Sequence, residues 1–100
     1  PQVVLPGVVA GLGLRLESWL ERDVPARWPD GRWTCVIDGG AGDARTARLV
    51  RAPGGRVALV DAGGEPLWTV GYGVGPTARV HARTRHFLWI TATDTSERKR

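Results

Sequence analysis

Clusters of glycine and proline divide the chain after residue 38 into short segments joined by brief links. The clusters are Gly39–Gly42, Pro53–Gly55, the pair Gly63-Gly64 and the pair Gly75-Pro76. Parallel neighbouring strands need crossover connections of a dozen or more residues, whereas antiparallel strands can be joined by tight turns. The spacing of these clusters therefore predicts antiparallel strands.

The segments between the clusters have the composition of β-strands. They cover residues 32–38, 44–52, 56–61, 67–74 and 79 to about 93. Within the first of them Trp33, Cys35 and Ile37 alternate with more polar residues, as expected for a strand with one buried face. We expect these segments to form a four- to five-stranded antiparallel β-meander.

The N-terminal part of the chain has apolar residues at spacings of three and four. This spacing is typical of an amphipathic helix. The helix is expected to start near Pro6 or Gly7 and to end by Asp23, because Pro25 disfavours helical geometry at the residue before it. Its apolar residues would be Val8, Val9, Leu12, Leu16, Trp19 and Leu20.

Together these patterns predict an α+β fold in which the N-terminal amphipathic helix packs on the antiparallel β-meander. A small open β-barrel plugged by the helix is the alternative. Residues 1–93 would form a single domain and residues 94–100 a frayed basic polar tail. We expect Trp19, Trp33 and Trp68 in the core and leave the places of Trp28 and Trp89 open.

Several functional classes are excluded by length and composition. One hundred residues give room for one domain, which excludes a large multidomain enzyme. Cys35 is the only cysteine, so no intramolecular disulfide is possible, and a reducing cytoplasmic location is expected. The apolar stretch 3–14 is shorter than the ~20 residues of a membrane span. The sequence has neither the ligand spacing of a metal site nor the context of a phosphate-binding loop, so we expect no metal and no cofactor.

Charge is distributed unevenly along the chain. The net charge is +4, but residues 1–43 carry −2 and residues 44–100 carry +6. All basic residues except Lys99 are arginines, which suit bidentate phosphate recognition. A high-GC coding sequence of bacterial or phage origin would also replace lysine with arginine, and the sequence leaves both explanations open.

The last predicted strand carries the main functional hypothesis. Strand alternation from residue 79 would put basic residues and then aromatic residues on one face. Guanidinium groups bind phosphates and aromatic rings stack on bases, so this face predicts binding of RNA or DNA. An edge strand whose charges only prevent aggregation is the competing interpretation. The candidate residues for nucleic-acid binding are Arg79, His81, Arg83, Arg85 and Trp89.

Two other functions remain open beside this non-enzymatic binding module. Exposed tryptophans and a sheet edge would suit a protein partner or self-association. His81 and His86 are candidate catalytic residues of a metal-independent, toxin-like ribonuclease, in which imidazole moves the proton of a 2′-hydroxyl. On a regular strand these two side chains would point to opposite faces, which argues against a shared site.

Overall fold

The computed structural model describes residues 2–40 and 45–95, and it is built almost entirely from strands. No helix of seven residues or more occurs in these two ranges. The strands are β1 (Val3–Leu5), β2 (Val8–Gly11), β3 (Leu14–Glu21), β4 (Thr34–Asp38), β5 (Arg45–Arg51), β6 (Val57–Asp61), β7 (Pro66–Thr69), β8 (Gly73–Val74) and β9 (Phe87–Asp94). Two single 3₁₀ turns, η1 (Pro53–Gly55) and η2 (Pro76–Ala78), complete the fold.

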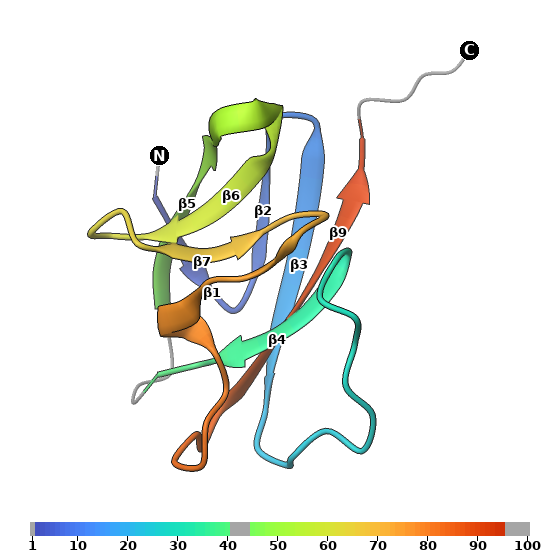
Figure 1. The fold of residues 1–100 in the computed structure, drawn as a ribbon, viewed down its shortest axis with the longest axis vertical. Helices are drawn as coiled ribbons and strands as arrows, with labels where there is room; N and C mark the ends of the chain where they lie inside the picture. Colours follow the sequence, from blue (N-terminus) through green and yellow to red (C-terminus); the bar gives the residue numbers. More distant parts are fainter. Residues whose placement is uncertain (1, 41–44, 96–100) are drawn as a thin grey trace.

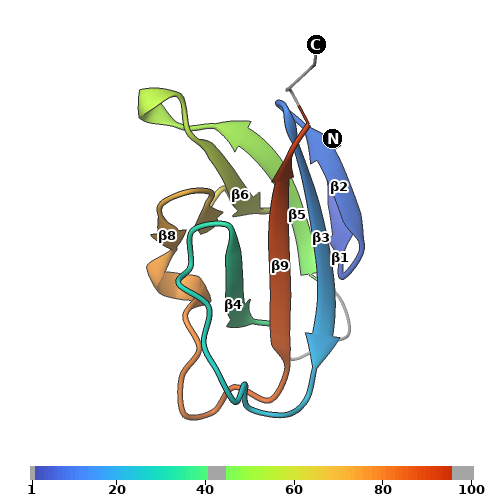
Figure 2. The same cartoon turned by 90° about the vertical axis from the view of Figure 1, so that its right-hand side faces the viewer.

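These strands form two antiparallel sheets that pack face to face (Figure 1). Sheet A has the order β1-β5-β6-β7-β8, and sheet B has the order β2-β3-β9-β4. Figure 2 shows the four strands of sheet B side by side, with sheet A behind them. The prediction of antiparallel strands is confirmed, but the predicted α+β fold is wrong because the second layer is a sheet rather than a helix.

The predicted N-terminal helix is replaced by a β-hairpin. Residues Leu12 and Gly13 have φ of 53° and 80°, so they form the two-residue turn that matches the twist of a hairpin. Along β3, Leu14 and Leu16 are buried while Arg15 and Glu17 are exposed. Burial therefore alternates with a period of two, and the spacing of three and four that suggested a helix is coincidental. The alternative prediction, a barrel plugged by the helix, is wrong for the same reason.

The predicted simple meander is also only partly present. Strands β5 to β8 follow one another in sheet A, but the chain leaves sheet B after β4 and returns to it at β9. Strand β9 inserts between β3 and β4, pairing Trp89 with both Trp19 and Val36. Its end includes Asp94, and residues 96–100 of the predicted tail lie outside the described residues.

The core fills the space between the two sheets. Its largest fully buried side chains come from both layers: Leu5, Leu59, Leu67 and Trp68 from sheet A, and Leu16, Ile37, Leu88 and Ile90 from sheet B. Each sheet therefore covers the apolar face of the other, in the place where we predicted a helix.

Only one of the three tryptophans expected in the core is there. Trp68 is fully buried, and its indole Nε1 donates to the Gly31 carbonyl at 2.7 Å. Trp19 and Trp33 are 39% and 50% exposed, which corrects their prediction as core residues. Trp19 stacks on Trp89 on the outer face of sheet B, with the ring centroids 5.9 Å apart.

Candidate nucleic-acid interface

The residues between η2 and β9, Arg79–His86, form an irregular segment that we call the basic segment. The prediction that the last strand begins at Arg79 is wrong, because β9 begins only at Phe87. A local turn replaces the strand: the Thr84 amide donates to the His81 carbonyl at 3.0 Å, and the His81 amide donates to Thr84 Oγ1 at 2.9 Å. Such side-chain bonds to nearby backbone compete with extended structure.

Asp38, the last residue of β4, anchors the basic segment from outside it. Its carboxylate Oδ2 accepts from His81 Nε2 at 2.9 Å and from Thr84 Oγ1 at 3.1 Å. Its Oδ1 accepts from the Gly40 amide at 2.7 Å, and its backbone carbonyl accepts from the Arg45 guanidinium. One carboxylate therefore joins the turn of the basic segment to the end of sheet B.

Gly39 provides the second anchor because its backbone approaches the basic segment closely. The Gly39 amide donates to the His86 carbonyl at 2.8 Å. A Cβ added at Gly39 would lie 2.9 Å from a Leu20 methyl carbon and 3.1 Å from His86 Cβ. Only glycine allows this contact without displacement of its neighbours.

The two histidines hold the segment in different ways. His81 uses both ring nitrogens, since Nε2 faces Asp38 and Nδ1 accepts from the Arg83 amide at 3.1 Å. His86 Nδ1 lies 3.3 Å from the Gly40 carbonyl, and because a carbonyl only accepts, this nitrogen donates. His81 thus holds the segment through two contacts, whereas His86 Nε2 takes no part in the contact with Gly40.

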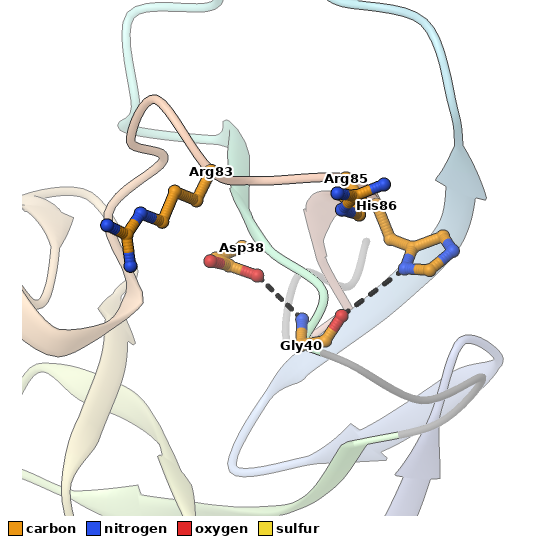
Figure 3. A pocket seen from close by; sticks show the side chains of 5 residues that line it. All are labelled: Asp38, Gly40, Arg83, Arg85 and His86. Atoms are coloured by element: carbon orange, nitrogen blue, oxygen red, sulfur yellow. Dashed lines mark hydrogen bonds between the residues drawn. The ribbon is translucent and has the colours of Figure 1, made fainter.

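A cavity of about 340 Å³ lies between the basic segment and the end of β4. Its lining brings together Arg83, Arg85, His86, Asp38 and Gly40 (Figure 3). In this view Arg83 lies on one side of Asp38 and Gly40, and Arg85 and His86 lie on the other. The cavity therefore has guanidinium groups on both sides of a backbone turn, an arrangement that suits an oxyanion such as phosphate.

A second cavity, of about 370 Å³, is lined by the other end of the same segment. Arg79 and Val80 form one part of its lining, and Trp28, Val36 and Val74 form the rest. Trp28 is 50% exposed, and its ring meets Phe87 edge to face with the centroids 6.3 Å apart. This cavity combines an accessible aromatic ring with one guanidinium group.

The three arginines of the basic segment are free to meet a ligand. Arg79, Arg83 and Arg85 are exposed, and within residues 2–40 and 45–95 their side chains make no ion pair. Asp38 is the carboxylate that lines the first cavity, and it already accepts three hydrogen bonds. An anionic ligand would therefore meet exposed guanidinium groups with which no carboxylate in those two ranges forms an ion pair.

Four of the five residues predicted for nucleic-acid binding lie in the basic segment, although not on a common strand face. Trp89 is separate from them: it lies on β9, half-buried beneath the Trp19 stack. Trp28 and Asp38, which the sequence did not indicate, contribute a ring and the main anchor. Because Asp38 and Thr84 are 46 residues apart, no local pattern could have indicated their contact.

The cysteine, the turn aspartate and the possible metal ligands give less support for a functional site. Cys35 is buried, and burial raises the pKa of its thiol, which disfavours the reactive thiolate. Asp61 accepts from the amides of Gly63 and Glu65 and stabilises the turn after β6. Among the described residues no three His, Cys, Asp or Glu side chains are grouped closely enough to hold a metal ion. The described part of the chain also contains no helix suited to crossing a membrane.

Comparisons of the chain with protein-family models, with curated proteins and with solved structures find no match.

Proposed function

We propose that this protein is a non-enzymatic module that binds single-stranded nucleic acid along the basic segment. The observation that carries the proposal is the pair of cavities at the two ends of one segment. Arg83 and Arg85 line the first, and Arg79 and Trp28 line the second. Proteins that bind single strands combine positive charge along the backbone with aromatic rings on which bases stack.

The chemistry of each cavity favours a different part of the ligand. The first offers guanidinium groups and a backbone turn, which suit a phosphate. The second offers an indole that is 50% exposed, together with apolar Val36 and Val74, which suit an unstacked base. A duplex keeps its bases stacked inside, so a single strand fits this combination better.

Fluorescence anisotropy with a labelled pyrimidine oligonucleotide tests the proposal. Single-stranded RNA, single-stranded DNA and a duplex of the same length are titrated at several salt concentrations. We expect the single strands to bind more tightly than the duplex. Replacing Arg83 and Arg85 with serine should weaken binding and reduce the slope of log K against log salt by about 1.4, since each phosphate contact contributes about 0.7 on single strands.

A charge-matched control separates the site from net charge. The pair Arg15→Ser and Arg56→Ser removes the same charge from β3 and from the residue before β6, outside the basic segment and outside the lining of both cavities. This pair should leave most of the affinity intact. Trp28→Leu should weaken binding by about 5- to 150-fold, the equivalent of one stacked base. Equal losses in the two arginine pairs, or no saturable binding at low salt, would overturn the proposal.

The RNA recovered after the titration gives a further readout. We expect it to be intact, and its cleavage would overturn the non-enzymatic part of the proposal. We also propose a cytoplasmic location, supported by the single buried cysteine, because a thiol without a disulfide partner is compatible with a reducing compartment. RNA and DNA are then both accessible ligands, and the two single-stranded arms of the titration distinguish them.

A further inference from the structure

The two sheets have four edge strands, and two of these, β1 and β2, have no further strand on their outer side within residues 2–40 and 45–95. β8 is only two residues long, and β4 is anchored to the basic segment. By contrast, β1 and β2 consist of Val-Val-Leu and Val-Val-Ala-Gly, with no charge or proline. Edge strands usually carry charged residues or proline, because these residues prevent pairing with another chain. The β2 edge lacks this protection.

The backbone of β2 shows which groups face outward. The Ser18 amide donates to the Gly7 carbonyl at 2.9 Å, and the register pairs Val9 with Leu16 and Gly11 with Leu14. Hydrogen-bonded pairs alternate along antiparallel strands, so the N–H and C=O groups of Val9 point toward β3. Those of Val8 and Ala10 therefore point away from sheet B, toward the open edge.

Apolar side chains surround this edge. Val4, Val8 and Leu12 are 60%, 52% and 43% exposed. A cavity of about 320 Å³ beside β2 is lined by apolar residues that include Val9 and Leu49. The edge therefore offers both unpaired backbone groups and apolar surface, the two features that an added β-strand requires.

We propose that two copies of this chain pair through their β2 strands around a two-fold axis at Val9. Only Val8 and Ala10 face outward, so antiparallel pairing matches Val8 with Ala10 of the partner subunit and Ala10 with the partner's Val8. Each matched pair exchanges two N–H to C=O bonds, which gives four bonds in all. The two copies of sheet B would join into one continuous sheet.

A second copy fits this edge because the pairing is self-complementary. A two-fold interface uses the same patch on both subunits, and an antiparallel strand pair satisfies that condition. The register is limited at one end by Pro6, which has no amide proton, and at the other by the Leu12-Gly13 turn. The proposal does not depend on the basic segment, because β2 and β4 are opposite edges of sheet B.

Sedimentation velocity over a range of protein concentrations tests the pairing. We expect a monomer–dimer equilibrium whose Kd rises at least tenfold in Ala10→Pro, which removes one donor from each copy. Proline is tolerated where an edge N–H faces solvent, so β2 itself should persist. Val8→Lys, which restores a protecting charge, should have the same effect. Thr93→Lys, on the same sheet but two strands away from the edge, is the control and should dimerise normally.

Amide hydrogen exchange identifies the paired residues. The amides of Val8 and Ala10 should become more protected as protein concentration rises, whereas the Val9 amide, bonded to β3, should be protected throughout. A monomer at every concentration would overturn the proposal. A dimer that survives both Ala10→Pro and Val8→Lys, or that leaves Val8 and Ala10 unprotected, would overturn it as well.

Discussion

Sheet B has two edges that differ sharply in what covers them. At β4 the edge ends in Asp38, and the basic segment lies against it through contacts of Asp38 and Gly39. At β2 the edge is apolar and uncharged, and no strand of the described part of the chain pairs with its outer side. The basic segment, which carries arginines of the proposed nucleic-acid site, is therefore held at the end of one edge strand, whereas the other edge strand has no such contact with it.

This difference implies that stability and ligand binding are linked at β4 and independent at β2. Loss of an anchor at Asp38 should loosen the basic segment and so displace Arg83 and Arg85. Changes at Val8 or Ala10 should leave that segment undisturbed.

The largest expected effect comes from core residues on the two edge strands. Ile37 on β4 is fully buried, and Val9 on β2 is 7% exposed. Ile37→Ala should lower the free energy of unfolding by about 2–5 kcal/mol, because it leaves a cavity between the sheets. Val9→Ala removes fewer atoms at a less enclosed place and should cost roughly 1–2 kcal/mol. Urea unfolding of both variants measures the difference, and equal losses would contradict the contrast between the edges.

Removal of the Asp38 carboxylate should have the next largest effect. Asp38→Ala leaves the Gly40 amide, His81 and Thr84 without their acceptor. Three hydrogen bonds at about 1 kcal/mol each give an expected destabilisation of about 2–3 kcal/mol in urea unfolding. Trypsin should also cut the basic segment faster, since its arginines would become more mobile.

Two further variants serve as controls for Asp38. Asp38→Asn keeps one acceptor oxygen and should lose about half as much stability as Asp38→Ala. Asp23→Ala, at an exposed position between β3 and β4, should change neither the unfolding nor the proteolysis. Unchanged trypsin cleavage in Asp38→Ala would show that the basic segment is held by other contacts.

The smallest predicted effect is a pH dependence that arises from Cys35 on β4. Burial raises the pKa of this thiol above its ordinary value of 9.0. Above pH 9 the unfolded chain releases the thiol proton while the folded chain retains it, so the folded state loses stability as pH rises. The free energy of unfolding should fall by about 1.4 kcal/mol per pH unit from this group. Cys35→Ala should remove that part of the slope, and an identical slope in both proteins would indicate that β4 opens readily.

The strands after residue 38 were largely predictable because their signals are local. Gly63-Gly64 and Gly54-Gly55 mark turns, and Leu59 and Trp68 lie on strands that follow directly in space. The N-terminal hairpin was not predicted, because the spacing of Val9, Leu12 and Leu16 is also that of an amphipathic helix. In the structure the positive φ angles of Leu12 and Gly13 form a tight turn, and strands lie on both sides of it.

The candidate site was predictable only in its composition. The arginines of the basic segment were identified from their charge, but their geometry depends on long-range contacts. Alternation predicted a strand through His81 and Arg83, whereas Asp38, far away in sequence, draws the segment into a turn. Trp28 likewise joins the second cavity only through folding.

The central place of β9 also has a consequence for synthesis on the ribosome. Chains grow from the N-terminus, so β3 and β4 emerge well before residues 87–94, which pair with both of them. Until that last strand emerges, β4 lacks the strand with which it pairs in sheet B, and sheet B covers the apolar face of sheet A only in part. A nascent chain halted before Phe87 would expose Leu59 and Trp68 to solvent, which makes it a substrate for chaperones or proteases rather than a smaller folded protein.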